Sequence, residues 1–274
     1  MTIEATTTLA AAGLTDTGKV REENEDQFFI GTLHKVLEVQ QTSLEAKEAF
    51  DYFTRTDARM LLVADGVGGV AGGRRASQTA VHTLATYIGQ TAGCYYDFDV
   101  EQEEEFLSRL EHALGRAHAA VRSLGARDTG PATTVTLAVV IGDRAYVAHV
   151  GDSRAYHFRR DRLRQITRDQ TMGDVLRDEG VLSDTQADAL GMSNILASAI
   201  GGPEMLPSIS LVDLVPGDAL LLCTDGLVKH VSDDAIRTVL ASDRTPEQAC
   251  RELVDAALAD GGSDNVTVVV ARAS

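Results

Sequence analysis

Acidic residues stand next to strongly apolar runs at four separate places in this chain. These places are Glu25-Asp26 before residues 28–30, Asp65-Gly66 after residues 60–64, Asp225-Gly226 after residues 219–224, and Asp264 before residues 266–270. A buried strand carries the side chain at its end to the rim of a sheet, where several such residues can gather. Carboxylates that lie close together repel one another unless a cation sits between them, and Mg²⁺ and Mn²⁺ prefer oxygen ligands. The pattern predicts a metal-dependent enzyme with an all-oxygen site.

Each Asp-Gly, taken alone, has a simpler explanation. Asp-Gly is a common dipeptide of hairpin turns, because glycine adopts the positive φ that such turns require. A single Asp-Gly therefore favours a turn over a metal ligand. The recurrence of acidic residues at four predicted strand ends favours the metal site instead.

The charge balance limits the partners of the chain. Its 274 residues include 25 basic and 41 acidic side chains, which give a formal net charge of −16 at pH 7. A protein with this net negative charge does not attract the phosphate groups of nucleic acid or of an anionic membrane. The same charge is compatible with the binding of cations. We therefore expect neither nucleic acid nor a membrane as a partner.

The cysteines and the N-terminus indicate a cytoplasmic protein. Cys94, Cys223 and Cys250 are too few and too scattered for a disulfide framework or a thiolate metal site. The first residues lack the basic start of a signal peptide. No apolar stretch approaches the roughly 20 residues that are needed to span a membrane. We expect a soluble protein, and a monomer.

Hydrophobic periodicity predicts one domain over residues 1–274, with strands and pairs of helices. The expected strands are 9–18, 26–33, 59–65, 134–140, 145–150, 154–158, 161–166, 208–213, 218–224 and 265–271. The expected helices run from the glycine-rich turn 66–73 to about residue 90, and over 101–124, 172–179, 184–190, 232–241 and 246–259. A polar insertion is expected at 34–58 and a flap-like segment at 170–205. Strands segregated from helix pairs favour an α+β fold with largely antiparallel sheets.

Five motifs in a fixed order give the chain a specific resemblance. They are Arg21-Glu22-Glu23-Asn24-Glu25-Asp26, Ala64-Asp65-Gly66-Val67-Gly68-Gly69, Val150-Gly151-Asp152-Ser153-Arg154, Thr224-Asp225-Gly226-Leu227 and Ser263-Asp264-Asn265. The set resembles the metal-dependent serine/threonine protein phosphatases of type 2C, in particular their prokaryotic single-domain branch. It extends from about Gly13 to Arg272. The resemblance implies a four-layer α-β-β-α sandwich, in which two antiparallel sheets are flanked by helix pairs.

The resemblance also implies a site of two Mn²⁺ or Mg²⁺ ions, with a third in some members. By motif position, Asp65 would bridge two ions, and the carbonyl group of Gly66 would bind the first. By the same resemblance, Asp225 and Asp264 would bind the second ion, and Glu25 and Asp26 would support the centre. Asp152 would hold the third ion together with Asp225. Arg21 would bind the substrate phosphate. For Arg21 alone, a solvated turn residue is the simpler interpretation, and a hairpin turn is the alternative for Asp152.

Such a site suits the hydrolysis of phosphomonoesters. Two neighbouring divalent cations lower the pKa of a shared water, which attacks phosphorus, and an arginine binds phosphate through its planar fork. We interpret the chain as a protein serine/threonine phosphatase. Its expected partners are phosphorylated proteins, namely a serine/threonine kinase or the substrates of one. Two alternatives remain: a phosphatase-fold module that binds or senses with little turnover, and a two-metal hydrolase of small phosphoesters.

The sequence departs from the pattern of the resembled family in four places. Val67 stands where many eukaryotic members have histidine, and Val70 and Arg74 stand where many bacterial members have histidine and glutamate. The Asp-His-Ser that is common after the central hairpin is Asp169-Gln170-Thr171 here. These changes leave the predicted ligands intact but leave open the source of the leaving-group proton.

Two further features receive structural interpretations. Strand alternation places His149 on the face opposite Val150, and we expect His149 and His157 to be structural. The glycines at 68–69 and 72–73 are not a phosphate-binding P-loop, because no Gly-Lys-Ser/Thr follows them.

Overall fold

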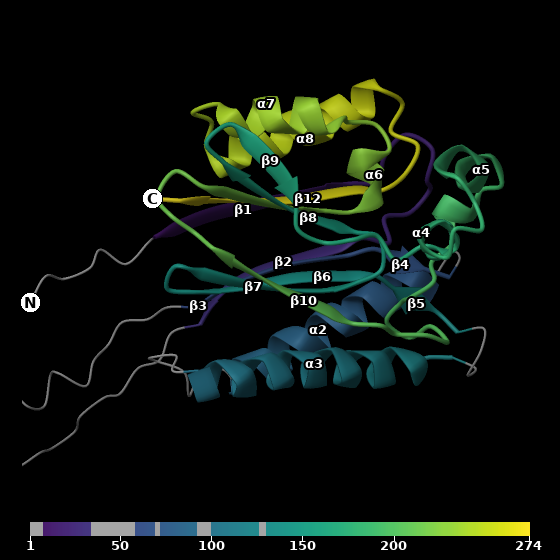
Figure 1. Cartoon of the computed structure of the whole chain (residues 1–274), viewed down its shortest axis with the longest axis horizontal. Helices are drawn as coiled ribbons and strands as arrows, with labels where there is room; N and C mark the ends of the chain where they lie inside the picture. The colour runs from purple at the N-terminus through teal and green to yellow at the C-terminus, as the bar shows by residue number, and fades with distance from the viewer. Residues whose placement is uncertain (1–7, 34–57, 69–71, 92–99, 126–129) are drawn as a thin grey trace, which may run out of the picture.

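Two five-stranded antiparallel sheets pack face to face (Figure 1). The computed structural model describes residues 8–33, 58–68, 72–91, 100–125 and 130–274. The first sheet has the order β1 (Leu9–Asp16), β12 (Val266–Ala273), β11 (Ala219–Cys223), β8 (Arg154–Arg159) and β9 (Arg162–Gln165). The second has the order β10 (Ser208–Asp213), β7 (Arg144–Val150), β6 (Val135–Ile141), β3 (Ala58–Ala64) and β2 (Gln27–Leu33). A short pair, β4 (Gly66–Val67) and β5 (Ala132–Thr133), lies at one end of the sandwich.

A pair of helices covers the outer face of each sheet (Figure 1). The pair on the second sheet is α2 (Gly72–Thr91) and α3 (Val100–Arg122), and the pair on the first is α7 (Asp233–Ala241) and α8 (Pro246–Ala259). The start of α8 follows from its sequence: Thr245 and Gln248 form a capping box, and Pro246 occupies the first turn. Ser232 caps α7 by accepting a hydrogen bond from the backbone N–H of Ala235.

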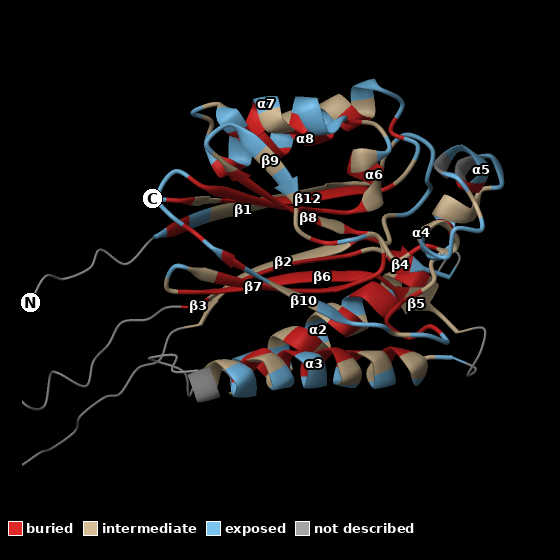
Figure 2. Ribbon diagram, viewed as in Figure 1, coloured by how far each residue is buried: buried red, intermediate tan, exposed pale blue. Residues whose placement is uncertain are grey.

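The inner strands β3, β6, β7, β11 and β12 are buried on both faces, which explains their continuous apolar sequences, whereas the edge strands β1, β2, β9 and β10 are partly exposed (Figure 2). In β3, Leu61 and Val63 pack between the two sheets, whereas Met60 and Leu62 pack against α2 and α3. Cys223 and Cys250 are buried free cysteines in the core between the first sheet and its helices, and Cys94 lies outside the described residues.

The predicted α+β sandwich is confirmed, and most element boundaries agree within about two residues. The pair β4–β5, the short helix α6 (Asp225–Val228) and a 3₁₀ turn, η2 (Met192–Asn194), are absent from the sequence prediction. The predicted insertion 34–58 lies outside the described residues except for Ala58, which begins β3.

The segment 170–205 forms a small helical layer at one end of the sandwich, beside β4 and β5 (Figure 1). It contains α4 (Met172–Asp178), α5 (Asp184–Ala189) and η2. Thr171 forms a capping box with Asp174 at the start of α4, and a bridge from Thr171 to Leu196 closes the segment. None of the helices in the described ranges is both long and apolar enough to cross a membrane.

Candidate metal centre

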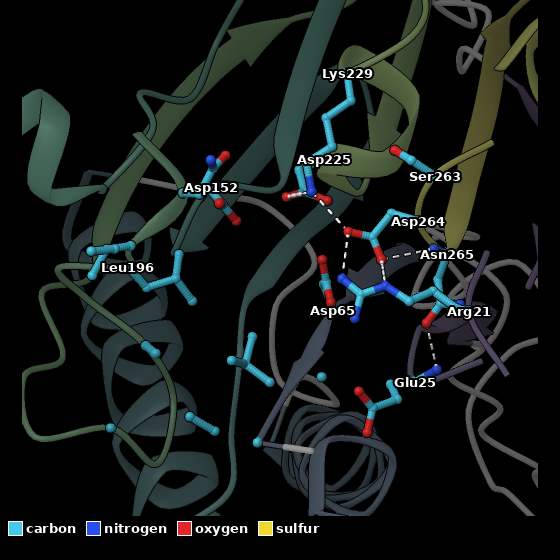
Figure 3. Close-up of a pocket in the computed structure, with 18 of the residues that line it drawn as sticks. Arg21, Glu25, Asp65, Asp152, Leu196, Asp225, Lys229, Ser263, Asp264 and Asn265 are labelled. Carbon is cyan, nitrogen blue, oxygen red and sulfur yellow. Dashed lines mark hydrogen bonds and ion pairs between the residues drawn. The ribbon is translucent and has the colours of Figure 1, made fainter. Parts of the chain in front are cut away.

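A cleft of about 790 Å³ opens at the end of the sandwich that carries β4, β5 and α6. It brings together residues from the N-terminal turn, from the ends of β3 and β11, from the β7–β8 connection and from the loop before β12 (Figure 3). Seven of the eight predicted site residues line it: Arg21, Glu25, Asp65, Gly66, Asp152, Asp225 and Asp264. Segments that are far apart in the sequence therefore meet at one rim, as the strand-end pattern predicts.

Asp26 lies behind the cleft rather than in its lining. Its side chain is 1% exposed, and its Oδ2 accepts hydrogen bonds from the hydroxyl groups of Thr224 (2.8 Å) and Thr267 (2.7 Å). Burial raises the pKa of Asp26 to about 7, with a further contribution from the charge of Asp225, while the threonine hydrogen bonds oppose the rise. Its Oδ1 has no hydrogen-bond partner within the described residues. The predicted acidic pair is thus split, with Glu25 in the cleft and Asp26 beneath it.

The two Asp-Gly glycines are needed for close backbone approach and not for turns. Neither Gly66 nor Gly226 has a positive φ. A Cβ atom at Gly66 would lie 2.2 Å from the carbonyl oxygen of Gly73, and one at Gly226 would lie 1.9 Å from that of Asn265. The hairpin-turn interpretation of both dipeptides is therefore wrong, because these glycines let neighbouring chains pack against the cleft.

Asp65 is held by its backbone at the end of β3. Its N–H donates to the hydroxyl of Thr134 (3.0 Å). Its carbonyl oxygen accepts from the N–H of Thr134 (2.8 Å) and from the hydroxyl of Thr133 (2.8 Å). These bonds account for the backbone and leave the carboxylate directed at the cleft (Figure 3).

Asp225 and Asp264 share one cationic side chain. Asp225 begins α6, and Lys229, which caps the C-terminus of that helix, places its Nζ 2.6 Å from Oδ2 of Asp225 and 2.8 Å from Oδ2 of Asp264. Arg21 approaches Asp264 from the other side, with Nε 2.8 Å from Oδ1 and Nη2 3.1 Å from Oδ2. Sequence reasoning missed Lys229, although its spacing of four residues from Asp225 on a helix is a recognisable signal.

Asn265 ties the N-terminal turn to the cleft. Its side-chain oxygen accepts from the backbone N–H of Glu25 (2.8 Å), and its amide nitrogen donates to the carbonyls of Thr17 and Glu23 (2.9 Å each). From the other side, the hydroxyl of Ser77 in α2 donates to the carbonyl of Glu25 (2.6 Å). Sequence reasoning quoted Asn265 within a motif but gave it no role, and the structure shows that it positions this segment.

Several residues that differ from the pattern of the resembled family make identifiable contacts. Arg74 donates from Nε to the carbonyl of Asn24 (2.9 Å). Gln170 accepts from the N–H of Gly151 (3.0 Å) and donates to the carbonyl of Leu206 (2.9 Å). Val67 lines the cleft and is 45% exposed, and Val70 lies outside the described residues.

Asp152 lines the cleft from the connection between β7 and β8. Burial, followed by the charges of Asp225 and Asp169, raises the pKa of Asp152 to about 7. The neighbouring Arg154 is bound to Asp169, with Nη2 2.7 Å from Oδ2, so the cation of this turn is already paired. The third-metal role of Asp152 stays a prediction.

The carboxylates of the cleft differ in how their charge is balanced. Burial, followed by the charges of Asp26 and Asp225, raises the pKa of Asp65 well above its ordinary value. Asp264 behaves in the opposite way: burial alone would raise its pKa, but the bonds from Lys229 and Arg21 outweigh burial and lower it. The ionised form of Asp65 is therefore disfavoured unless a cation lies close to it.

The donor set fits hard divalent cations. Oε1 of Glu25 and Oδ1 of Asp225 are buried without a hydrogen-bond partner in the described residues, and buried carboxylate oxygens are costly to leave unpaired. All the donors are oxygen atoms, as Mn²⁺ and Mg²⁺ prefer. In the parts of the chain that the structure describes, no three acidic, histidine or cysteine side chains form a ready metal-ligand group, and the cations that pair with Asp225 and Asp264 are those of Lys229 and Arg21.

The two histidines are buried and hydrogen-bonded, in agreement with a structural role. His149 Nε2 lies 3.0 Å from the carbonyl of Arg168, to which it must donate. Burial lowers the pKa of His149 to about 4, so the ring is neutral at pH 7 and its Nδ1 accepts from Thr136 (2.9 Å). His157 Nε2 donates to Asp218 (3.0 Å).

Comparison with known proteins identifies the family. Residues 41–261 match the protein phosphatase 2C family model. The chain is 34% identical over 269 residues, or 97% of its length, to the serine/threonine protein phosphatase PstP of Mycobacterium tuberculosis, and it spans 45% of that protein. It is 32% identical to the protein phosphatase PhpP of Streptococcus pneumoniae, over 80% of this chain and 87% of PhpP.

A solved structure agrees with these matches. The catalytic domain of PstP, in complex with two manganese ions, superposes with a TM-score of 0.73 at 31% identity and covers 98% of this chain and 99% of that one. The shared fold, the acidic cleft and the sequence identity show that this chain belongs to the protein phosphatase 2C family.

Proposed function

We propose that the chain is a metal-dependent protein serine/threonine phosphatase that hydrolyses phosphomonoesters. The observation that carries the proposal is the convergence of Glu25, Asp65, Asp225 and Asp264 on one cleft. Two buried oxygens there, Oε1 of Glu25 and Oδ1 of Asp225, have no hydrogen-bond partner among the residues that the structure describes. The named activity of the related PstP and PhpP supports the same reaction. The complex of the PstP catalytic domain with two manganese ions supports the choice of metal.

The roles of the residues follow from their places in the cleft. Asp65 and the carbonyl of Gly66 would hold the first ion with support from Glu25, and Asp225 and Asp264 would hold the second. Two Mn²⁺ or Mg²⁺ ions, when bound, supply the nucleophilic water and offset charge on the phosphoryl oxygens. Asp26 supports the centre from beneath through Thr224 and Thr267.

Two residues would act on the substrate side or at a third ion. Arg21 has a side chain that is 54% exposed at the mouth of the cleft, where its planar fork suits a phosphate group. Asp152, with Asp225, would hold a third and weaker ion. Val67 has no proton to give the departing oxygen, so that proton comes from water.

The proposed substrates are proteins phosphorylated on serine or threonine, which include a serine/threonine kinase or its targets. The segment 170–205 contributes Asn194, Ile195 and Leu196 to the cleft wall, and Ile195 is 49% exposed, which offers an apolar contact to a peptide. We also propose that the protein acts in the cytoplasm as a monomer.

A rate comparison on two substrates tests the proposal. The full chain, stripped with EDTA and reloaded with Mn²⁺, is expected to release phosphate from a phosphothreonine peptide and to lose this activity when EDTA is added again. The kcat/KM for the peptide is expected to exceed that for a small aryl phosphate. A higher value for the aryl phosphate would instead indicate a hydrolase of small phosphoesters. Tight binding of the phosphopeptide with no release of phosphate would indicate a sensing module.

Replacing Arg21 with alanine is expected to raise KM for the phosphopeptide about tenfold with a smaller fall in kcat, because a bidentate charge-assisted contact to phosphate is lost. Arg21→Lys keeps the charge but loses the planar fork, so its KM is expected to lie between those of wild type and Arg21→Ala. Mn²⁺ affinity, measured by calorimetry, is expected not to fall in either variant. Loss of Mn²⁺ binding in Arg21→Ala would show that Arg21 supports the metal centre and not the substrate.

A further inference from the structure

Lys229 occupies a position between two predicted ligands of the second metal ion. Its ammonium group contacts Asp225 at 2.6 Å and Asp264 at 2.8 Å. These aspartates come from different parts of the chain, the start of α6 and the loop before β12, and the lysine lies where the two meet (Figure 3). The side chain is 34% exposed, so it is neither locked in the core nor free in solvent.

An ammonium group and a divalent cation cannot share these oxygens. Both would lie within a few ångströms of each other, where a single and a double positive charge repel strongly even in a polar protein environment. Binding of the divalent cation to these oxygens therefore requires the ammonium group to move away.

We propose that Lys229 is an internal counter-cation that holds the metal-free centre together and competes with the second divalent cation for Asp225 and Asp264. The inference rests on the proposed metal site. Lys229 then lowers the apparent affinity for the second ion. The reduction depends on the fraction of molecules in which the ammonium group contacts Asp225 and Asp264.

A destination for the displaced side chain is present beside the cleft. Lys229 also borders an adjoining cavity of about 260 Å³, which is lined by Asp152, Asp169 and Asp174 among others. Asp169 is paired with Arg154, and Asp174 is paired with an arginine of its own helix. Asp152 lines the same cavity and has no arginine partner among the residues that the structure describes, so it can receive the ammonium group when Lys229 moves away from Asp225 and no third ion is bound.

Titration of Mn²⁺ into the EDTA-stripped full chain, followed by calorimetry, tests the competition. Lys229→Met and Lys229→Gln remove the charge and keep most of the side-chain length. Each is expected to bind Mn²⁺ at the weaker of the two sites at least about tenfold more tightly than wild type. Arg237→Met is the matched control: it also removes one positive charge and two ion pairs to aspartates, the contacts with Asp161 at 2.6 Å and Asp234 at 3.7 Å. Its Mn²⁺ affinity is expected to stay within twofold of wild type, where twofold is about 0.4 kcal/mol.

The melting temperatures of the same variants, in EDTA and in Mn²⁺, distinguish a competing lysine from one that has only a structural role. In EDTA, Lys229→Met is expected to melt below wild type, because Asp225 and Asp264 repel each other without a cation. In saturating Mn²⁺ the gain in melting temperature is expected to be larger for the variant than for wild type, as tighter ligand binding requires.

Labelling of wild-type protein provides a test that needs no variant. Brief treatment with acetic anhydride, read by mass spectrometry, is expected to modify Lys229 at least about threefold more when Mn²⁺ is present than in EDTA, because the displaced amine is no longer held by two carboxylates. Lys19 serves as an internal reference for reagent strength.

The outcomes separate this inference from the proposed function. If wild type binds no Mn²⁺, both are overturned. If wild type binds Mn²⁺ but both Lys229 variants bind it equally or more weakly, only the competition is overturned, and Lys229 then positions the ligands. Unchanged labelling of Lys229 in wild type on addition of Mn²⁺ also overturns the competition, including where the variants fail to fold.

Discussion

Replacing Asp65 with asparagine is expected to lower the rate of phosphopeptide hydrolysis at least about a hundredfold, the scale of losing a main electrostatic contribution to catalysis. Asp65 stands at the end of β3 with its backbone fixed by Thr133 and Thr134, so the substitution changes charge while the main chain keeps its place. In the proposed function the lost charge would belong to a ligand of the first ion. The measurement is kcat for a phosphothreonine peptide at saturating Mn²⁺.

The stability of the variant distinguishes lost chemistry from lost structure. Asparagine relieves the repulsion between Asp65 and its acidic neighbours, so the melting temperature of Asp65→Asn in EDTA is expected to equal or exceed that of wild type. Asp143→Asn is the matched control, since it makes the same change at an exposed residue of the β6–β7 turn, and its rate is expected to match wild type. A rate for Asp65→Asn within about threefold of wild type would remove Asp65 from the metal site.

Replacing Asp218 with alanine is expected to lower the free energy of unfolding by about 3 kcal/mol, the lower end of the cost of breaking a buried ion pair. Asp218 is 2% exposed and accepts hydrogen bonds from Arg159 Nη2 (2.6 Å), His157 Nε2 (3.0 Å) and the N–H of Val215 (3.0 Å). Its removal leaves a buried imidazole and a backbone N–H without partners. The cost stays at the lower end because Arg159 is 35% exposed and can turn to water. Urea denaturation followed by circular dichroism measures the difference.

The stabilisation by Asp218 is expected to depend on pH in a defined direction. Burial alone would raise the pKa of Asp218, but the bonds from Arg159 and His157 outweigh burial and lower it below its ordinary value. A carboxyl group with a lowered pKa in the folded protein stabilises it above the unfolded pKa of about 4, and this stabilisation is lost as the pH falls through the folded value. The gap in stability between wild type and Asp218→Ala is therefore expected to shrink as the pH falls below about 4.

An exposed aspartate provides the control for Asp218. Asp213 pairs with Arg144 at 2.8 Å, but its side chain is 67% exposed, and such pairs contribute at most about 1 kcal/mol. Asp213→Ala is therefore expected to destabilise the protein by less than about 1 kcal/mol. An equal loss for the two variants would show that burial of the Asp218 pair adds nothing.

Local sequence determines most of the layers of this fold. Residues 60–64 and 219–223 are continuous apolar runs because each strand is covered on both faces, and such runs predict buried strands without any knowledge of their neighbours. The start of α8 at Thr245 is likewise readable, since the capping box is made by residues close in sequence. The predicted metal ligands at the ends of these strands do meet at one rim, since the strands themselves carry them there.

Only the tertiary structure decided which acidic residues line the cleft and which lie behind it. Glu25 and Asp26 are adjacent in sequence, yet one lines the cleft and the other lies beneath it on threonines from β12 and the start of α6. Gly66 and Gly226 look like turn residues, and only the packing of distant backbone against them shows that they have no room for a side chain.

The cations of the cleft show the same division between local and distant information. The sequence by itself determined the acidic motifs, the order of strands and helices along the chain, and hence the fold class. The tertiary structure decided that Lys229 pairs with Asp264, 35 residues away, and Arg21 with the same aspartate, 243 residues away. The physical reason is that the spacing of apolar residues along a strand or helix reflects which of its faces are buried. The balance of charge in a cleft depends instead on side chains that only folding brings within a few ångströms of one another.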